Sequence, residues 1–489
     1  MSSKKSNSSI YLLVCILIIT CSAQISCTSI VKKKPNVLFV VFDDLNDWEG
    51  CLSGHPQSMT PNIDRLAKQG VLFTNAHAAG VMCCPSRASV MTGLRPTTTG
   101  VYKNTDTPLD LYKEKQTLNK HFKDNGYFVA GAGKILHKFY YEERDWHEFV
   151  SRHQDENIIT NRENPVKENI TTVSGNIAWG GFSSPDSLTF DGKSVDWIAE
   201  RINREHDKPF FLACGIFRPH IPWFNPQKYF DQHPLHDVKL PLIKKEDLDD
   251  VPPIGKNIAF STSNFTMDND LNNEEFNVEY EVLKKDSLWD DAVRAYLASV
   301  SYADAQFGRL LDALENSPYA DNTIIVLWSD HGWHLGEKEH WRKATLWEEV
   351  TRVPFIISAP EMSVNQKSDQ AVSLIDIYPT LIEMCGLPEI SELDGESLVR
   401  LLLHPNEKRD NPAISSLGPN YHAIRDQQYR YISYGDGQEE LYDHASDPEE
   451  WINLANNTSY FEIKEKLKAH IPKEAKAPLK GLYNVKNKK

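Results

Sequence analysis

The sequence predicts an α/β fold, with one large, mostly parallel sheet sandwiched by helices. A smaller C-terminal α+β subdomain containing an antiparallel sheet is expected to follow. Two observations predict this fold: short, continuously apolar runs alternate with helical patterns, and a polar cluster follows each of four such runs. Alternating strands and helices are typical of a parallel sheet that is covered on both faces. With 489 residues, the chain is long enough to bury a large core.

Four apolar runs are the expected strands of the main sheet. The first, Asn36 to Phe42, ends at two aspartates, and the others span 127–130, 209–216 and 323–328. A helix is expected from Thr60-Pro61, where a cap precedes an early proline, to Gly70. A longer helical pattern, 292–315, precedes the last run.

The remaining segments set the expected domain boundaries. Regions 140–185 and 225–290 are polar and irregular, and we expect long loops or insertions near the site. After residue 400, two apolar runs flank Gly435-Asp436-Gly437, which predicts a hairpin. We therefore expect a leader at 1–27, a main domain at 35–400, and a C-terminal subdomain with a basic tail at 401–489.

The first residues have the layout of a secretory signal peptide. Lys4 and Lys5 precede an apolar run, 10–20, which is short for a membrane span, and small residues follow. Simple cleavage of the leader and lipidation at Cys21 or Cys27 both remain open. We expect an exported protein in the periplasm or on the surface of a bacterium, with membrane contact only through such a lipid anchor.

The composition excludes several classes of protein. Apolar residues make up 40% of the chain and charged residues 25%, which excludes a disordered or multi-span membrane chain. The net charge of −15 argues against nucleic acid as a partner. An anionic substrate is still compatible, because a few cations in a cleft can outweigh the mean charge.

Acidic residues at the ends of two expected strands suggest a metal site. Asp43 and Asp44 are adjacent like charges, and Asp330 and His331 follow the last strand. Parallel strands bring their carboxyl ends to one edge of the sheet, and oxygen ligands suit Ca²⁺ or Mg²⁺. Either pair taken alone would be read as a solvated turn.

The most informative stretch runs from Cys83 to Gly93, with the sequence CCPSRASVMTG. It places a thiol at the start of a helix and Arg87 one turn later. Helix N-termini favour anions and lower the pKa of a thiol. A buried structural cysteine is the alternative. Five cysteines lie beyond the leader, at 51, 83, 84, 214 and 385, and their odd number and spacing indicate no disulfide framework.

This stretch resembles the signature C-x-P-S-R-x-x-x-x-T-G of the type I, formylglycine-dependent sulfatases of the alkaline-phosphatase superfamily. Further blocks are similar to the iduronate-2-sulfatase-like branch, in the same order over residues 35–455. They are 36–44, 133–137, 217–222, 329–337 and 440–454. The resemblance implies an alkaline-phosphatase-like fold and a sulfuric ester hydrolase.

The resemblance also implies the nucleophile and the metal ligands. Cys83 would be oxidised to formylglycine by a maturation enzyme, and Cys84 would occupy a variable position. Arg87 would hold the formylglycine hydroxyl. One divalent cation, Ca²⁺ or alternatively Mg²⁺, would be bound by an oxygen of residue 83 together with Asp43, Asp44, Asp330 and His331.

Further positions match the sulfate pocket of the family, namely Lys134, His137, His220 and Lys343. His220 is the candidate general acid, with Lys343 left open as the alternative, and His137 is the candidate base. Three residues near matched positions are expected to face the sugar: His334, Lys103 and Asn104.

The expected function is hydrolysis of O-sulfate esters on oligosaccharides derived from sulfated polysaccharides. These would be of the algal ulvan or carrageenan type, or a glycosaminoglycan. One alternative is a phosphomonoester or phosphonate hydrolase on the same fold. Another is a non-catalytic binder of sulfated glycans in which Cys83 stays unconverted. The sugar, the sulfate position, the endo or exo mode and the oligomeric state stay open.

Overall fold

The computed structural model describes residues 33–138, 141–151, 170–174, 177–261, 278–285 and 287–479. The expected leader, 1–27, lies outside the described residues. In this part of the chain, no helix is long and apolar enough to cross a membrane. The five cysteines beyond the leader are all described, and none forms a disulfide.

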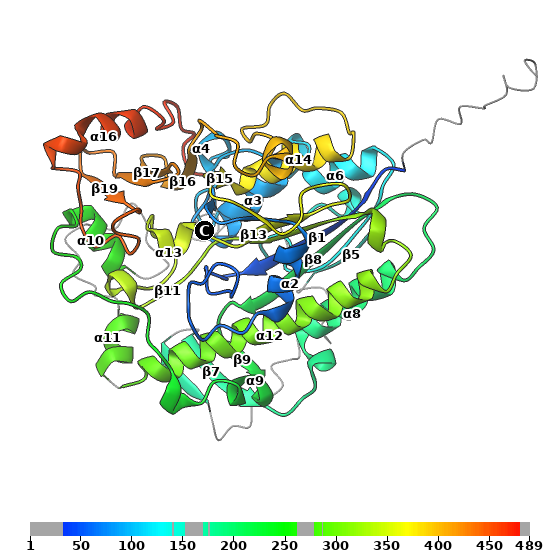
Figure 1. Cartoon of the computed structure of the whole chain (residues 1–489), viewed down its shortest axis with the longest axis horizontal. Coiled ribbons are helices and arrows are strands. Elements are labelled where there is room, and N and C mark those ends of the chain that lie inside the picture. Colours follow the sequence, from blue (N-terminus) through cyan, green and yellow to red (C-terminus); the bar gives the residue numbers. More distant parts are fainter. Residues whose placement is uncertain are drawn as a thin grey trace, which may run out of the picture. The chain divides into compact units, whose positions relative to one another are not determined.

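An eight-stranded sheet forms the centre of the fold (Figure 1). Its order is β14-β2-β13-β10-β1-β8-β4-β5, and only β13 runs antiparallel to both of its neighbours. This confirms the predicted α/β fold with a mostly parallel sheet. The strands are β1 (Asn36–Asp43), β2 (Val71–Phe73), β4 (Phe128–Gly133), β5 (Glu148–Ser151), β8 (Phe210–Pro219), β10 (Thr323–Ser329), β13 (Phe355–Ser358) and β14 (Gln366–Ser368).

The continuous apolar runs are explained by burial on both faces of this sheet. In β1, Leu38 and Val40 pack into one hydrophobic cluster, whereas Val37 and Phe39 pack into another on the opposite face. All eight residues of β1 are buried. A strand with one solvated face would alternate apolar and polar residues, so the absence of alternation was the correct signal for a central strand.

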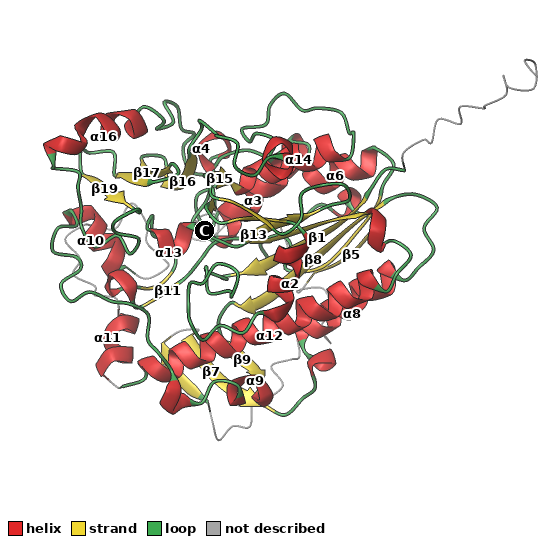
Figure 2. Ribbon diagram, in the orientation of Figure 1, coloured by secondary structure: helices red, strands yellow, loops and turns green. Residues whose placement is uncertain are grey.

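Helices cover both faces of the sheet (Figure 2). On one side lie α2 (Pro61–Gln69), α8 (Phe190–Ile202), α9 (Gln227–Asp231) and α12 (Trp289–Glu315). On the other lie α3 (Cys83–Thr92), α6 (Leu118–Asp124), α14 (Ile377–Met384) and α15 (Val399–Leu403). The other described helices are α4 (Pro96–Thr99), α5 (Leu109–Glu114), α10 (Pro253–Phe260), α11 (Val278–Lys285), α13 (Glu348–Thr351) and α16 (Phe461–Lys468).

The first helix, α2, begins and ends where the sequence predicts, but its cap differs. The Thr60 hydroxyl accepts a hydrogen bond from the Gly50 amide at 2.8 Å instead of capping the helix. The Asp304 carboxylate of α12 accepts the amides of Asn62 and Ile63, at 3.1 and 2.8 Å. A distant side chain therefore caps α2, which a local sequence pattern cannot reveal.

Four smaller sheets complete the described fold. The predicted hairpin is confirmed as β18 (Tyr429–Ser433) and β19 (Glu439–Asp443), in an antiparallel sheet with β16 (Ala413–Gly418) and β17 (Tyr421–Arg425). The others join β6 (Thr171–Ser174), β7 (Ile177–Phe182) and β9 (Trp223–Pro226); β3 (Ala76–His77) and β15 (Val372–Ser373); and β11 (His334–Leu335) and β12 (Trp341–Arg342).

The two regions expected to be long loops or insertions contain regular structure where they are described. Region 140–185 contributes β5 to the edge of the main sheet and also contains β6 and β7. Region 225–290 contains α9, α10 and α11. The described parts are therefore insertions with regular structure rather than long loops. The sequence did not reveal these elements, because short edge elements with mixed polarity give a weak periodic signal.

Candidate active site

The predicted polar residues meet at the carboxyl edge of the main sheet. Strands β4, β8, β1 and β10 are adjacent and parallel, so their C-terminal ends lie side by side. Asp43 ends β1, Lys134 follows β4, His220 follows β8 and Asp330 follows β10. The order of strands thus brings together residues that are up to 287 positions apart.

Cys83 lies at the centre of this edge and is 1% exposed. Its Sγ is 3.1 Å from Lys343 Nζ, 3.4 Å from His331 Nε2 and 3.6 Å from Lys134 Nζ. Burial opposes ionisation of this thiol, but the ammonium groups of Lys134 and Lys343 outweigh it and hold the pKa of Cys83 well below its ordinary value. The site therefore stabilises negative charge on side chain 83.

The start of α3, which carries Cys83, is held by a residue from a separate loop. Met82 occupies the N-cap without a side-chain hydrogen bond, and Asn104 Oδ1 accepts the Cys84 amide at 2.9 Å. The Lys103 amide donates to Asp106 Oδ2 at 2.8 Å, which shapes that loop. Lys103 and Asn104 are half-buried beside the helix start. Their predicted contact with a sugar stays a prediction, but the Asn104 oxygen already has a partner.

Arg87 lies one turn along α3 and is fully buried. Its Nε donates to Asp330 Oδ2 at 2.7 Å, and its Nη2 lies 3.4 Å from Asp43 Oδ1. The guanidinium also donates to the carbonyls of Ile135 and Phe42, at 3.1 and 3.3 Å. In this structure Arg87 thus orients two of the predicted metal ligands, and its expected contact with residue 83 stays a prediction.

The predicted ligands fit a divalent cation. Asp43 Oδ1 and Asp44 Oδ2 are buried and accept no hydrogen bond. One ligand atom each from Asp43, Cys83, Asp330 and His331 lie within 4.8 Å of one another. Carboxylate oxygens left without donors in a buried site, together with one imidazole, are a donor set suited to a hard cation.

The two histidines of the predicted sulfate pocket differ in their surroundings. His137 is 8% exposed, and burial lowers its pKa to about 4, although a hydrogen bond to Cys83 opposes the shift. The side chain of His220 is 21% exposed, and its Nε2 lies 3.7 Å from Asp44 Oδ2. Its Nδ1 lies 2.6 Å from the carbonyl oxygen of Ile221, so the other ring nitrogen faces the site.

Lys343 reaches the site from outside the main sheet, in the residue that follows β12. Its Nζ donates to Asp44 Oδ1 at 2.7 Å as well as to Cys83. Burial disfavours the ammonium, but Asp44 and Cys83 outweigh this effect and raise the pKa of Lys343. Lys343 is therefore a firmly charged group next to residue 83.

His334 does not face the site as expected. It is fully buried, its Nε2 contacts Thr345 Oγ1 at 2.8 Å, and its ring packs edge-on against His340 and Trp347. Its place in β11 points it into the protein interior. This placement argues against a sugar contact, because proximity in sequence to Asp330 does not fix the direction of a side chain.

The sequence reasoning missed Tyr296, which holds the loop behind the aspartates. The Tyr296 hydroxyl donates to the Asp44 carbonyl at 2.8 Å and accepts the Asn46 amide at 3.0 Å. Tyr296 lies on α12 and is fully buried, so in the sequence it is indistinguishable from a core aromatic. Only the packing of α12 against the β1 loop reveals its role.

Comparison with known families identifies the chain. Residues 35–387 match the sulfatase family, and residues 336–477 match the C-terminal region of N-sulphoglucosamine sulphohydrolase. The chain belongs to the sulfatase family. This family match confirms the resemblance that the signature indicated. It also confirms that the protein is an enzyme of the sulfatase class.

Individual relatives extend over most of this sulfatase. It is 40% identical to a sulfatase of Formosa agariphila, with 92% of this chain and 90% of the relative covered. It is 27% identical to an ulvan-active sulfatase of the same organism, over 90% and 81%. It is 29% identical to human iduronate 2-sulfatase, over 72% and 69%.

A solved structure shares the fold of this chain. The phosphonate monoester hydrolase of Agrobacterium radiobacter superposes with a TM-score of 0.73 at 21% identity. The match covers 90% of this chain and 96% of that one. At this identity the likeness establishes the fold alone.

Proposed function

We propose that this protein is an exported sulfatase that hydrolyses O-sulfate esters of oligosaccharides derived from sulfated polysaccharides. Residue 83 acts as formylglycine, and a divalent cation, Ca²⁺ or alternatively Mg²⁺, is bound beside it. The observation that carries the proposal is the position of Cys83, between two ammonium groups and next to two buried carboxylates, Asp43 and Asp44, each with one oxygen that accepts no hydrogen bond. The Cys83 sulfur stands where the oxygens of the oxidised side chain would lie.

The groups around residue 83 suit a reaction in which negative charge develops. A hydrated formylglycine supplies a geminal diol, in which one hydroxyl attacks sulfur and the other allows sulfate to be expelled. The ammonium groups of Lys134 and Lys343 lie close to the sulfur of Cys83. In this position they neutralise charge on the transferring sulfuryl group. Arg87 fixes the neighbouring carboxylates.

The cation would be held by Asp43, Asp44, Asp330 and His331 with an oxygen of residue 83. When bound, it supplies positive charge that polarises sulfate oxygens and acidifies a hydroxyl. At this site three cationic side chains face three carboxylates. The cations are Arg87, Lys134 and Lys343, and the carboxylates are Asp43, Asp44 and Asp330. A divalent cation therefore leaves the site with the excess positive charge that an anionic substrate requires.

Two proton transfers are assigned to the histidines. His220 is the proposed acid for the leaving alcohol, because its side chain is 21% exposed whereas that of Lys343 is 6% exposed and bound to Asp44. Lys343 remains the alternative acid. His137 carries little charge at neutral pH, since burial lowers its pKa to about 4, so it can accept a proton from an oxygen on residue 83.

The proposed substrate is a sulfated saccharide rather than an aryl sulfate. Two relatives carry saccharide activities in their names, an ulvan-active sulfatase and an iduronate 2-sulfatase. A formylglycine-generating maturation enzyme is the second proposed partner. Export to the periplasm or cell surface rests on the leader pattern at 1–27.

Two measurements test the proposal. Mass spectrometry of the peptide containing residue 83 should show the aldehyde, about 18 Da lighter than the thiol, because oxidation exchanges sulfur for oxygen and removes two hydrogens. Release of sulfate from a panel of ulvan, carrageenan and glycosaminoglycan oligosaccharides should then identify the substrate. An unconverted thiol in a protein that releases sulfate at full rate would contradict the proposed nucleophile.

The same panel separates the alternatives. Faster hydrolysis of an aryl phosphate or phosphonate monoester than of any sulfate ester would favour the phosphohydrolase. An unconverted Cys83, saturable binding of sulfated glycans and no turnover would favour the non-catalytic binder.

A further inference from the structure

The backbone that carries Lys343 is strained on both sides of this residue. Arg342 and Ala344 adopt left-handed conformations, with φ of 87° and 69°. Lys338 and Glu339 do the same, with φ of 53° and 50°. We call residues 338–344 the Lys343 segment. Each such conformation is disfavoured for a residue other than glycine and persists only where the surroundings over-determine it.

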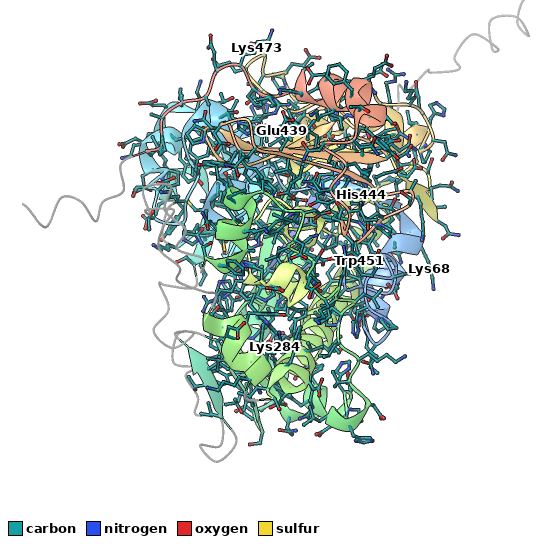
Figure 3. The ribbon with its side chains drawn as sticks, turned by 90° about the vertical axis from the view of Figure 1, so that its left-hand side faces the viewer. Lys68, Lys284, Glu439, His444, Trp451 and Lys473 are labelled. Atoms are coloured by element: carbon teal, nitrogen blue, oxygen red, sulfur yellow. The ribbon has the colours of Figure 1, made fainter. Side chains whose placement is uncertain are left out.

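One restraint on this segment is a bidentate ion pair between Arg342 and Glu279 of α11. Arg342 Nε donates to Glu279 Oε2 at 2.5 Å, and Arg342 Nη2 meets Glu279 Oε1. Glu279 is 3% exposed, so the pair is largely shielded from water. Figure 3 looks onto the side of the molecule where α11 lies, with its Lys284 labelled. A forked pair fixes both the distance and the plane of the guanidinium.

A second restraint is His340, which is 1% exposed. Its Nδ1 lies 2.7 Å from the carbonyl oxygen of Ala259 in α10, and its Nε2 lies 3.1 Å from that of Lys343. The Ala344 amide donates to the carbonyl of Val81 at 3.2 Å, two residues before Cys83. The Lys343 segment is thus tied to α10, to α11 and to the chain that enters α3.

We propose that Arg342, Glu279 and His340 are positioning residues for the Lys343 ammonium. They hold the strained backbone so that Lys343 Nζ stays 3.1 Å from the sulfur of Cys83 and 2.7 Å from Asp44 Oδ1. This inference rests on the proposed role of Lys343 in the sulfate pocket. It holds whether Lys343 neutralises the sulfuryl group or protonates the leaving oxygen.

A double-mutant cycle on the mature enzyme tests the inference. Arg342→Gln and Glu279→Gln should each lower kcat on an aryl sulfate by about 10- to 100-fold, since a misplacement of about 1 Å has such an effect. In a Lys343→Ala background the same substitutions should lower kcat no further, because the group that they position is gone. Arg342→Lys should behave like Arg342→Gln, because an ammonium cannot form the fork.

The matched control is another Arg–Glu pair, Arg201 of α8 and Glu148 of β5. Arg201 Nε donates to Glu148 Oε2 at 2.8 Å, and the arginine side chain is 8% exposed. Arg201→Gln should lower the melting temperature while leaving kcat unchanged in both backgrounds. A substitution that only destabilises the fold would therefore be recognised by a lower melting temperature with an unchanged kcat.

Two outcomes would overturn the inference. The first is a fall in kcat for Arg342→Gln that is equal in the wild-type and Lys343→Ala backgrounds. The second is a crystal structure of Arg342→Gln in which Lys343 Nζ keeps its contacts to residue 83 and Asp44; displacement of Nζ supports the inference. A wild-type protein that hydrolyses no sulfate ester would count against the proposed function alone, because the crystal structure still decides the positioning.

Discussion

Two buried ionic clusters in this sulfatase look alike as lists of residues and differ in whether buried carboxylate oxygens are left without a hydrogen bond. One is the active-site edge, with Asp43, Asp44 and Asp330. The other, which we call the C-terminal charge cluster, consists of Glu348, Arg425, Arg430, His444 and Glu450. Each contains at least three residues of kinds that bind metals, with ligand atoms within 4.8 Å of one another.

In the C-terminal charge cluster the carboxylates are paired with cations. Arg430 is fully buried and bridges Glu348 and Glu450, contacting Glu450 Oε1 at 2.6 Å. His444 Nε2 lies 3.0 Å from the same oxygen, and Glu450 Oε2 accepts the Glu348 amide at 3.0 Å. Burial raises the pKa of Glu348, but His444 and Arg430 outweigh it and hold it well below the ordinary value.

At the active-site edge the carboxylates also have cationic partners, but one oxygen each of Asp43 and Asp44 accepts no hydrogen bond. Proximity of ligand-type residues is therefore weak evidence for a metal. Buried acceptor oxygens without donors are the stronger evidence, because leaving them unpaired is costly unless a cation binds. We expect the first cluster to bind a cation and the second to stabilise the fold.

The largest effect should come from the nucleophile. Cys83→Ala should lower kcat by about 10⁴-fold or more while the melting temperature stays close to wild type, because residue 83 is the proposed nucleophile. Sulfate release and thermal unfolding measure the two effects. Cys84→Ala is the matched control and should retain formylglycine and turnover. Retained hydrolysis by Cys83→Ala would contradict the assignment.

The next effect concerns stability at the C-terminal charge cluster. Glu450→Gln should lower the free energy of unfolding by about 3–5 kcal/mol, since it leaves the buried Arg430 partly unpaired. The calcium concentration for half-maximal activity should not change. Denaturant titration and a calcium titration of chelated enzyme test both statements. A shifted calcium response would mean that this cluster also binds the metal.

The third prediction concerns cation binding at the active-site edge. Asp330→Asn removes a ligand charge and the partner of Arg87. It should weaken cation binding by about 100-fold, at the upper end of the range seen when supporting groups of metal sites are removed. The readout is the calcium concentration that restores activity after chelation. Unchanged chelator sensitivity would remove Asp330 from the ligand set.

A third buried carboxylate, Asp304, extends the comparison to a site without a cation in the described part of the chain. Asp304 accepts two backbone amides and the Asn62 side chain, and within the described residues it has no cationic partner. Burial raises its pKa from 3.8 to about 6. The folded state therefore binds the proton more tightly, and this group's contribution to stability falls as pH rises from about 4 to about 6, by up to about 3 kcal/mol.

Comparison with Asp304→Asn isolates that contribution. The stability of wild type minus that of the variant should decrease between pH 4 and 6 and stay constant above about pH 7. Denaturant unfolding at several pH values measures it. A difference that increases with pH would show that Asp304 is ionised and stabilised in the folded protein.

Much of this organisation could be predicted from local sequence. Continuous apolar runs identified β1, β8 and β10, and the residues after them formed the site, because parallel strands share one carboxyl edge. The sequence predicted the wrong surroundings for His334 and gave no sign of the role of Tyr296. Both errors have one cause. The direction of a side chain and the packing of a helix on a loop depend on contacts between distant parts of the chain.

By itself, the sequence determined the central strands, though not their exact ends, the thiol at the start of α3 and the family, because each rests on neighbouring residues. Only the tertiary structure decided which carboxylates keep oxygens without donors, which distant residues cap α2 and α3, and how the Lys343 segment is restrained. These features depend on what surrounds a buried charge, and its neighbours in space come from elements far apart in the chain.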